Sequence, residues 1–197
     1  SKIDPHYHIT ELSHSRYIVD LLQRERVASL LDVGCGTGPI YDLLVNSQEG
    51  EWDNITKYKG VDYSWQMVET ANKNFPHGTW DVQDARQLKE ETSSWDCVLL
   101  MHCLDHLDDY KSAIKEATRV ASKYVLIVLW RGFVDEGTNL NSRNDMGKKK
   151  DEKGNLLEEP WKDTHLQEYS RLALEDCFRV NDLTIELTAE GEAINGE

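Results

Sequence analysis

The segment LDVGCGTG at residues 31–38 places three glycines at alternate positions, directly after a short apolar run. Glycine loses more conformational freedom on folding than any other residue, so this spacing indicates that the backbone must approach something closely. Pro39 follows and suits the first turn of a helix, whose N-terminus favours an anion. Binding of a dinucleotide pyrophosphate is therefore the first chemistry to consider.

The glycine spacing does not match the dinucleotide fingerprint G-x-G-x-x-G. In one frame the third glycine position holds Pro39, and in the other it holds Tyr41. The pattern is G-x-G-x-G, so the dinucleotide fingerprint fails in both frames. A nicotinamide-dependent oxidoreductase remains only as a rival hypothesis.

Carboxylates stand where other predicted strands end. Asp62 lies near the end of a strand predicted over 57–63, and Asp84 near the end of one predicted over 79–85. The glycine loop and Met101 follow two further apolar runs. Ligands of open α/β sheets bind beyond the carboxyl ends of the strands, so we expect these segments to converge on one rim.

The elements that must position these residues alternate along the chain. Apolar runs predict strands at residues 27–33, 57–63, 79–85, 94–104 and 123–130. Helical spacing predicts helices over 11–25, after Pro39, after Ser64 as N-cap, and after Asp108 and Asp109. This alternation predicts an α/β, Rossmann-like fold: a mostly parallel twisted sheet with helices on both faces.

The ordered set of motifs resembles a known family. LDVGCGTG, VDYS at 61–64, QDA at 83–85 and WDCVLLMHCLDHL at 95–107 resemble the class I S-adenosylmethionine-dependent methyltransferases, in particular their small-molecule, methyltransferase type 11-like branch. The likeness is strongest over residues 27–130. It implies one class I methyltransferase domain over residues 1–197 and S-adenosyl-L-methionine as the cofactor, with a lid helix within 1–26 and an insertion or lid loop at 131–163.

The resemblance also assigns roles at the glycine loop and the second strand. Asp32 and the glycines Gly34, Gly36 and Gly38 would form the loop under the methionine moiety of the cofactor. Asp62 would accept hydrogen bonds from both ribose hydroxyls, which charge assistance strengthens. Tyr63 and Met67 would flank the adenine, with ordinary packing as the alternative for both.

The remaining cofactor contacts come from the third and fourth strands and the N-terminal segment. By resemblance, Asp84 would accept from the adenine amino group and the Ala85 N–H would reach a ring nitrogen; a plain cap is the alternative for Asp84. Met101 would lie near the amino-acid moiety and the methyl group. Arg16 could bind the methionine carboxylate, or it could be a surface residue.

The chemistry implied is an in-line displacement in which the protein contributes alignment and exclusion of water. His102 is the candidate general base for a protonated acceptor, whereas His106 is expected to pack. The place of an Asn/Asp-Pro-Pro-Tyr motif reads MHCL, and neither Cys97 nor Cys103 follows a proline. These features favour O- or N-methylation of a small molecule. A protein or RNA acceptor, or a cofactor-binding module without methyl transfer, are the alternatives.

The composition limits the kinds of partner that this chain is expected to bind. The chain has 36 acidic and 22 basic residues and a formal net charge of −14, which argues against a nucleic-acid partner. No apolar run approaches the ~20 residues of a membrane span, so no membrane partner and a cytoplasmic location are expected. The four cysteines lack C-x-x-C spacing and predict reduced thiols. His6 and His8 could pair on a metal, but two histidines alone do not predict a metal site. The oligomeric state is open.

The chain after residue 130 departs from the alternation. Residues 131–163 are rich in Gly, Asn, Asp and Lys, and regularity returns with a helix predicted over 166–178 and a strand over 180–187. The family sheet usually ends in a hairpin of its last two strands. The remaining residues are too few and too polar to predict a seventh strand, which stays uncertain.

Overall fold

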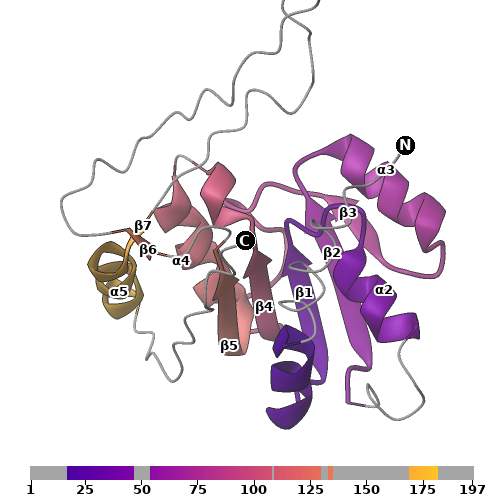
Figure 1. Cartoon of the computed structure of the whole chain (residues 1–197), viewed down its shortest axis with the longest axis horizontal. Coiled ribbons are helices and arrows are strands. Elements are labelled where there is room, and N and C mark those ends of the chain that lie inside the picture. The colour runs from indigo at the N-terminus through magenta and orange to yellow at the C-terminus, as the bar shows by residue number, and fades with distance from the viewer. Residues whose placement is uncertain (1–16, 47–53, 108, 130–132, 135–168, 182–197) are drawn as a thin grey trace, which may run out of the picture.

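A computed structural model describes residues 17–46, 54–107, 109–129, 133–134 and 169–181 of the 197-residue chain. Its centre is a five-stranded parallel sheet in the order β3-β2-β1-β4-β5 (Figure 1). The strands are β1 (Ser29–Val33), β2 (Lys57–Asp62), β3 (Trp80–Val82), β4 (Trp95–Met101) and β5 (Ala121–Val128). The strand order reverses between β1 and β4, which makes the rim beyond these strands the expected binding place.

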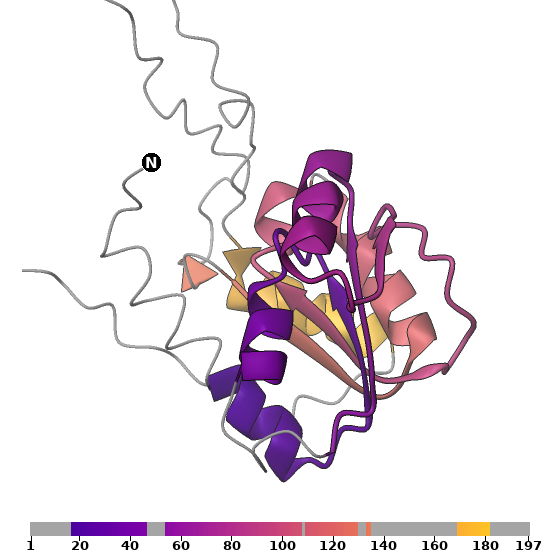
Figure 2. The ribbon, with the colours of Figure 1, turned by 90° about the vertical axis from the view of Figure 1, so that its right-hand side faces the viewer.

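Helices cover both faces of the sheet, as predicted. They are α2 (Pro39–Asn46), α3 (Trp65–Asn74), α4 (Tyr110–Val120) and α5 (Arg171–Val180), together with a helix over residues 17–24. Figure 2 shows α2 and the helix over 17–24 on one side of the sheet and α4 on the other. The fold is therefore a Rossmann-like α/β layer structure, which confirms the fold class expected from the sequence.

The two faces of β1 explain this layering. Leu30 lies in the apolar cluster with Ile18, Leu22 and Ile40, whereas Leu31 lies in the cluster with the buried residues of α4 and α5. Successive side chains of a strand point to opposite faces, so an apolar run such as VASLLDV serves both layers at once.

Capping residues set the helix starts that face the carboxyl rim. The Ser64 hydroxyl accepts from the Met67 N–H at 3.4 Å, and the Asp109 carboxylate accepts from the Ser112 N–H at 3.2 Å. Both caps satisfy N–H groups that have no partner within a helix. They fix α3 directly after Asp62 and α4 directly after the loop that follows β4.

The structure also differs from the sequence prediction in detail. β3 ends at Val82, and no helix forms between it and β4. Phe133–Val134 (β6) and Tyr169–Ser170 (β7) form a small parallel pair, so α5 begins at Arg171, later than the prediction of residue 166. Most of the predicted insertion and the strand predicted over 180–187 beyond Asn181 lie outside the described residues.

Candidate functional site

The glycine loop joins the carboxyl end of β1 to α2, and its backbone requires glycine. The φ angles of Gly34, Gly36 and Gly38 are 81°, 54° and 90°, a region that residues with a Cβ rarely adopt. The N–H groups of Gly34 and Cys35 donate to the Val61 carbonyl oxygen at 2.8 and 3.1 Å. The loop is thereby fixed to the end of β2.

The three glycines differ in what a Cβ would meet. A Cβ on Gly34 would lie 2.8 Å from the Cβ of Cys103, and one on Gly38 would lie 2.8 Å from the Trp80 ring. A Cβ on Gly36 would have no heavy atom within 4 Å. The missing side chains of Gly34 and Gly38 therefore make room for the protein itself, and Gly36 is the position that leaves the backbone open to a ligand.

Asp62 connects the second strand to this open position. Its Oδ2 accepts from the Gly36 N–H at 2.9 Å, and its Oδ1 accepts from the Ser64 N–H at 2.8 Å. Each carboxylate oxygen can accept more than one hydrogen bond, so capacity for ligand hydroxyls remains on both. The carboxylate is partly exposed and held in one orientation from two sides.

These bonds change the chemistry expected of the loop. Phosphate-binding loops present their N–H groups to an anion. Here the N–H of Gly36 donates to a carboxylate, and the N–H groups of Gly34, Cys35 and Gly38 donate to carbonyl oxygens. The loop therefore fits a ligand that brings hydroxyl donors and positive charge better than a pyrophosphate, in agreement with the failed dinucleotide fingerprint. A sulfonium nucleoside has these properties.

Large exposed side chains stand beside Asp62 at the start of α3. Tyr63 is 74% exposed and Met67 is 44% exposed. Trp65 is 60% exposed, and the sequence reasoning did not select it, although its place directly after the Ser64 cap was a usable signal. Exposed aromatic and thioether groups next to the Asp62 carboxylate offer apolar surface to a planar group.

Asp84 lies in the turn after β3, where Arg86 holds it. The Asp84 carboxylate accepts from the Arg86 backbone N–H at 2.9 Å and from its guanidinium, with Nη2 at 2.6 Å from Oδ2. These hydrogen bonds hold the pKa of the Asp84 carboxyl below its usual range. The next residue, Ala85, is buried in the apolar core. Arg86 was not identified from the sequence, because a contact two residues away carries no motif.

Asp32 is buried on β1, two residues before the loop. It is 2% exposed, and its Oδ2 accepts from the Tyr58 hydroxyl at 2.7 Å. Burial raises the pKa of Asp32 to about 7, which the Tyr58 hydrogen bond opposes and the charge of Asp62 reinforces. Asp32 therefore lies beneath the site, bound to a residue that sequence reasoning did not connect with it.

The end of β4 completes the rim. His102 has a φ of 50°, a strained value for a residue with a Cβ, and its N–H donates to the Val128 carbonyl oxygen at 2.8 Å. Met101 and His102 are both half-buried. Cys103 packs against Gly34, so the segment after β4 adjoins the glycine loop, as the convergence of strand ends predicted.

The remaining predicted site residue, Arg16, lies outside the described residues.

Within the described part of the chain, no helix has the length and apolar character that crossing a bilayer requires. The helix over 17–24, which belongs to the predicted lid, buries Ile18 and Leu22 against the sheet. Its role as a lid stays a prediction.

The fold is a Rossmann-like domain, and its carboxyl rim brings together the glycine loop, Asp62 and the segment after β4. A model of the methyltransferase domain family matches residues 8–188 of the 197-residue chain. The chain therefore belongs to this family, the class I S-adenosylmethionine-dependent methyltransferases, as its motifs indicated. S-adenosyl-L-methionine is the cofactor of that class.

Individual relatives agree with this placement. The ubiquinone/menaquinone biosynthesis C-methyltransferase UbiE of Campylobacter jejuni is 27% identical over 100 residues, which are 51% of this chain and 43% of the relative. Ajmaline N-methyltransferase of Rauvolfia serpentina is 29% identical over 107 residues, 51% of this chain and 35% of the relative. The chain thus spans less than half the length of these curated relatives.

A solved structure shares this fold. DesVI of Streptomyces venezuelae superposes with a TM-score of 0.60 at 18% identity and covers 94% of this chain and 93% of its own. At this identity the likeness supports the fold alone. It shows that the described sheet and helices form the framework of a known type of domain.

Proposed function

We propose that this chain transfers a methyl group from S-adenosylmethionine to an oxygen or nitrogen atom of a small-molecule acceptor. The observation that carries the proposal is the Asp62 carboxylate, which the N–H groups of Gly36 and Ser64 orient beside Gly36, the glycine of this loop with open space at its Cβ position. In this position it would accept from the ribose hydroxyls, while Tyr63 and Met67 would flank the base.

Bound S-adenosylmethionine supplies a methyl group on a positively charged sulfur, and the neutral thioether that remains after methyl transfer is a good leaving group. The residues of this chain then have three tasks: to hold the nucleoside, to align the acceptor with the methyl–sulfur axis, and to exclude water. The Asp62 carboxylate places negative charge at the loop, where its Oδ2 lies 2.9 Å from the Gly36 nitrogen, and this charge favours a cationic ligand over an anionic one.

His102 is the proposed general base. It directly follows β4, and the hydrogen bond from its N–H to the Val128 carbonyl oxygen at 2.8 Å holds its backbone in this place. An amine or phenol with a pKa near ~10 arrives largely protonated and needs a base at neutral pH. The imidazole of His102 would take this proton.

The acceptor class follows from charge and size. A net charge of −14 opposes a nucleic-acid acceptor and favours neutral or cationic small molecules. A carbon acceptor is a second candidate, because the Campylobacter jejuni relative is named a C-methyltransferase. A cytoplasmic location belongs to the same proposal.

A methyl-transfer assay tests the proposal. The purified chain is incubated with S-adenosylmethionine and a panel of phenols, amines and quinols, and methylated products are identified by mass spectrometry. We expect the His102→Asn variant, which tolerates a positive φ, to lose about 10²-fold or more in rate with unchanged affinity for S-adenosylhomocysteine. His106 was expected to pack but is exposed, so His106→Asn, the same change in the same segment, is the matched control. Tight cofactor binding without any methylated product would instead favour a binding module.

A further inference from the structure

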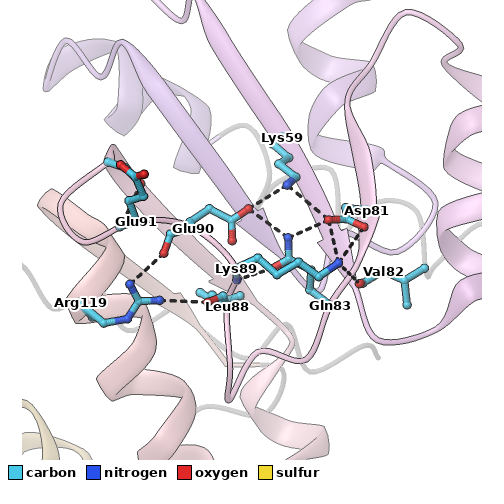
Figure 3. Close-up of polar contacts among 10 residues, drawn as sticks. Lys59, Asp81, Val82, Gln83, Leu88, Lys89, Glu90, Glu91 and Arg119 are labelled. Atoms are coloured by element: carbon cyan, nitrogen blue, oxygen red, sulfur yellow. Dashed lines mark hydrogen bonds and ion pairs between the residues drawn. The ribbon is translucent and has the colours of Figure 1, made fainter.

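The connection from β3 to β4 crosses the sheet without a helix. Residues 83–94 pass from the edge strand β3 over the face of β2 and β1 to β4, and they bury Ala85 and Leu88 in the core. A cluster of polar side chains takes the place of a helix in fixing this connection (Figure 3). We call it the crossover network: Lys59, Asp81, Gln83, Lys89, Glu90 and Arg119.

Gln83 is the centre of the crossover network. It is 5% exposed, and its Nε2 donates to Glu90 Oε1 at 3.0 Å and to Asp81 Oδ2 at 3.1 Å. Its Oε1 accepts from the Lys89 N–H at 3.0 Å. Every polar atom of the buried amide is therefore used, which fixes its orientation.

Glu90 is the charged acceptor of one of the hydrogen bonds from this amide. Its side chain is 7% exposed, and Oε1 accepts from Lys59 Nζ at 2.8 Å as well as from Gln83. Burial acts to raise the pKa of Glu90, but the hydrogen bonds from Lys59 and Gln83 outweigh it and lower the pKa. Glu90 is therefore a buried carboxylate that stays ionised through its partners.

Arg119 anchors the far side of the connection to α4. Its guanidinium donates to the carbonyl oxygens of Glu90 at 2.8 Å and Leu88 at 3.0 Å, and it pairs with Glu116. The Glu116 carboxylate also accepts from the Leu88 N–H at 2.9 Å. Residues 88–90 are thus held to a helix, independently of the contacts that Gln83 makes.

The near side of the network reaches the proposed cofactor site. The Gln83 N–H donates to the Asp62 carbonyl oxygen at 3.0 Å, and Gln83 immediately precedes Asp84 and Ala85. The same residue therefore ties the sugar-binding end of β2 to the turn proposed to recognise the adenine. A displacement of Gln83 would move this turn relative to the sugar.

We propose that Lys59, Gln83 and Glu90 are positioning residues that set the selectivity of this enzyme for an adenine base. They touch no ligand; they hold the turn at Asp84 and Ala85 at the place where an adenine on the ribose would meet it. This inference rests on the proposed function and on the role that the family resemblance implies for Asp84 and Ala85, contact with the edge of the base.

Two ligands that differ only at the base test the proposal: S-adenosylhomocysteine and its deaminated analogue, S-inosylhomocysteine. The Glu90→Gln variant removes the charge with the shape kept. We expect its affinity for S-adenosylhomocysteine, measured by calorimetry, to fall about tenfold, and its affinity for the inosine analogue to fall less than about threefold. Glu91→Gln, the same change at the exposed neighbour, should leave both affinities unchanged.

A second variant keeps the proposal testable if the Glu90→Gln protein does not fold. Lys59→Met with Glu90→Met replaces both charges by apolar side chains of similar length, which often preserves stability, and it should show the same loss of adenine preference. Equal losses for both ligands, or parent-like selectivity in either variant, would overturn the positioning role. A parent protein that binds neither ligand would instead refute the proposed function itself.

Discussion

Two buried carboxylates, one on each face of the sheet, are accommodated in opposite ways. Asp32 lies on the face of α2 and meets the neutral hydroxyl of Tyr58. Glu90 lies on the other face and pairs with the ammonium of Lys59. Lys59 belongs to this face because it lies opposite Leu31 in the pairing of β1 with β2, and Leu31 packs in the cluster that contains α4. Burial raises the pKa of Asp32 to about 7, whereas the partners of Glu90 lower its pKa.

The difference shows that burial alone does not decide the charge of a carboxylate. A neutral hydroxyl only partly offsets the loss of hydration, while a cation and an amide outweigh it. The face of Asp32 is packed with aromatic rings, among them Tyr41 and Tyr58 with centroids 5.0 Å apart. The interactions described for Asp32 include no cation. Uptake of a proton is therefore the way in which this carboxylate avoids a buried charge.

The largest expected effect comes from removing the carboxylate of Asp32. Its pKa is about 7 in the folded chain against an ordinary 3.8, so the folded state binds the extra proton between these values and stability falls as pH rises through them. Asp32→Asn keeps an acceptor for Tyr58 and removes this dependence. We expect its advantage in unfolding free energy over the parent to grow from pH 4 to pH 8, by on the order of 4 kcal/mol.

Urea denaturation at pH 4, 6 and 8 measures this difference. A difference between Asp32→Asn and the parent that does not change with pH would show that Asp32 keeps an ordinary pKa. The proposed difference between the two carboxylates would then be wrong, because burial would not raise the pKa of Asp32.

A somewhat smaller effect, of opposite pH dependence, is expected on the other face. Lys59→Met leaves Glu90 buried without its cation and should lower the unfolding free energy by about 3 kcal/mol at pH 7. The pKa of Glu90 is lowered in the folded chain, so the stability it contributes is present at neutral pH and lost as pH falls. The cost of Lys59→Met should therefore shrink as pH falls below 4.5, the ordinary pKa of this carboxyl.

Lys89→Met is the matched control for this prediction. The Lys89 ammonium contacts Asp81 at 3.1 Å, but its side chain is 62% exposed, so its loss should cost less than about 1 kcal/mol. Equal costs for the two lysine variants in urea titrations would contradict the distinction between a buried and an exposed ion pair.

The sequence predicted the framework because its signals are local. Apolar runs located all five strands of the sheet, and Ser64 and Asp109 cap helices as their residue types suggested. The β3–β4 crossover was not foreseen as a network, because its order comes from contacts between residues far apart in the chain. Lys59 and Glu90, for example, are separated by 31 positions.

The site shows the same limit at finer scale. The G-x-G-x-G pattern located the loop, but only the packed structure distinguishes Gly36 from Gly34 and Gly38, since Cys103 and Trp80 approach them from later strands. Tyr58 became the partner of Asp32 through the pairing of β1 with β2, where Asp32 lies opposite Gly60. Strand register cannot be read from a single motif.

The measurement that tests the central claim most directly is calorimetric titration of S-adenosylhomocysteine into the parent, Asp62→Ala and Glu69→Ala proteins. Glu69 is an exposed carboxylate of α3 and controls for the lost charge. Two charge-assisted hydrogen bonds to the ribose predict binding at least about 100-fold weaker for Asp62→Ala, with Glu69→Ala like the parent. A folded Asp62→Ala protein that binds within threefold of the parent would contradict the account.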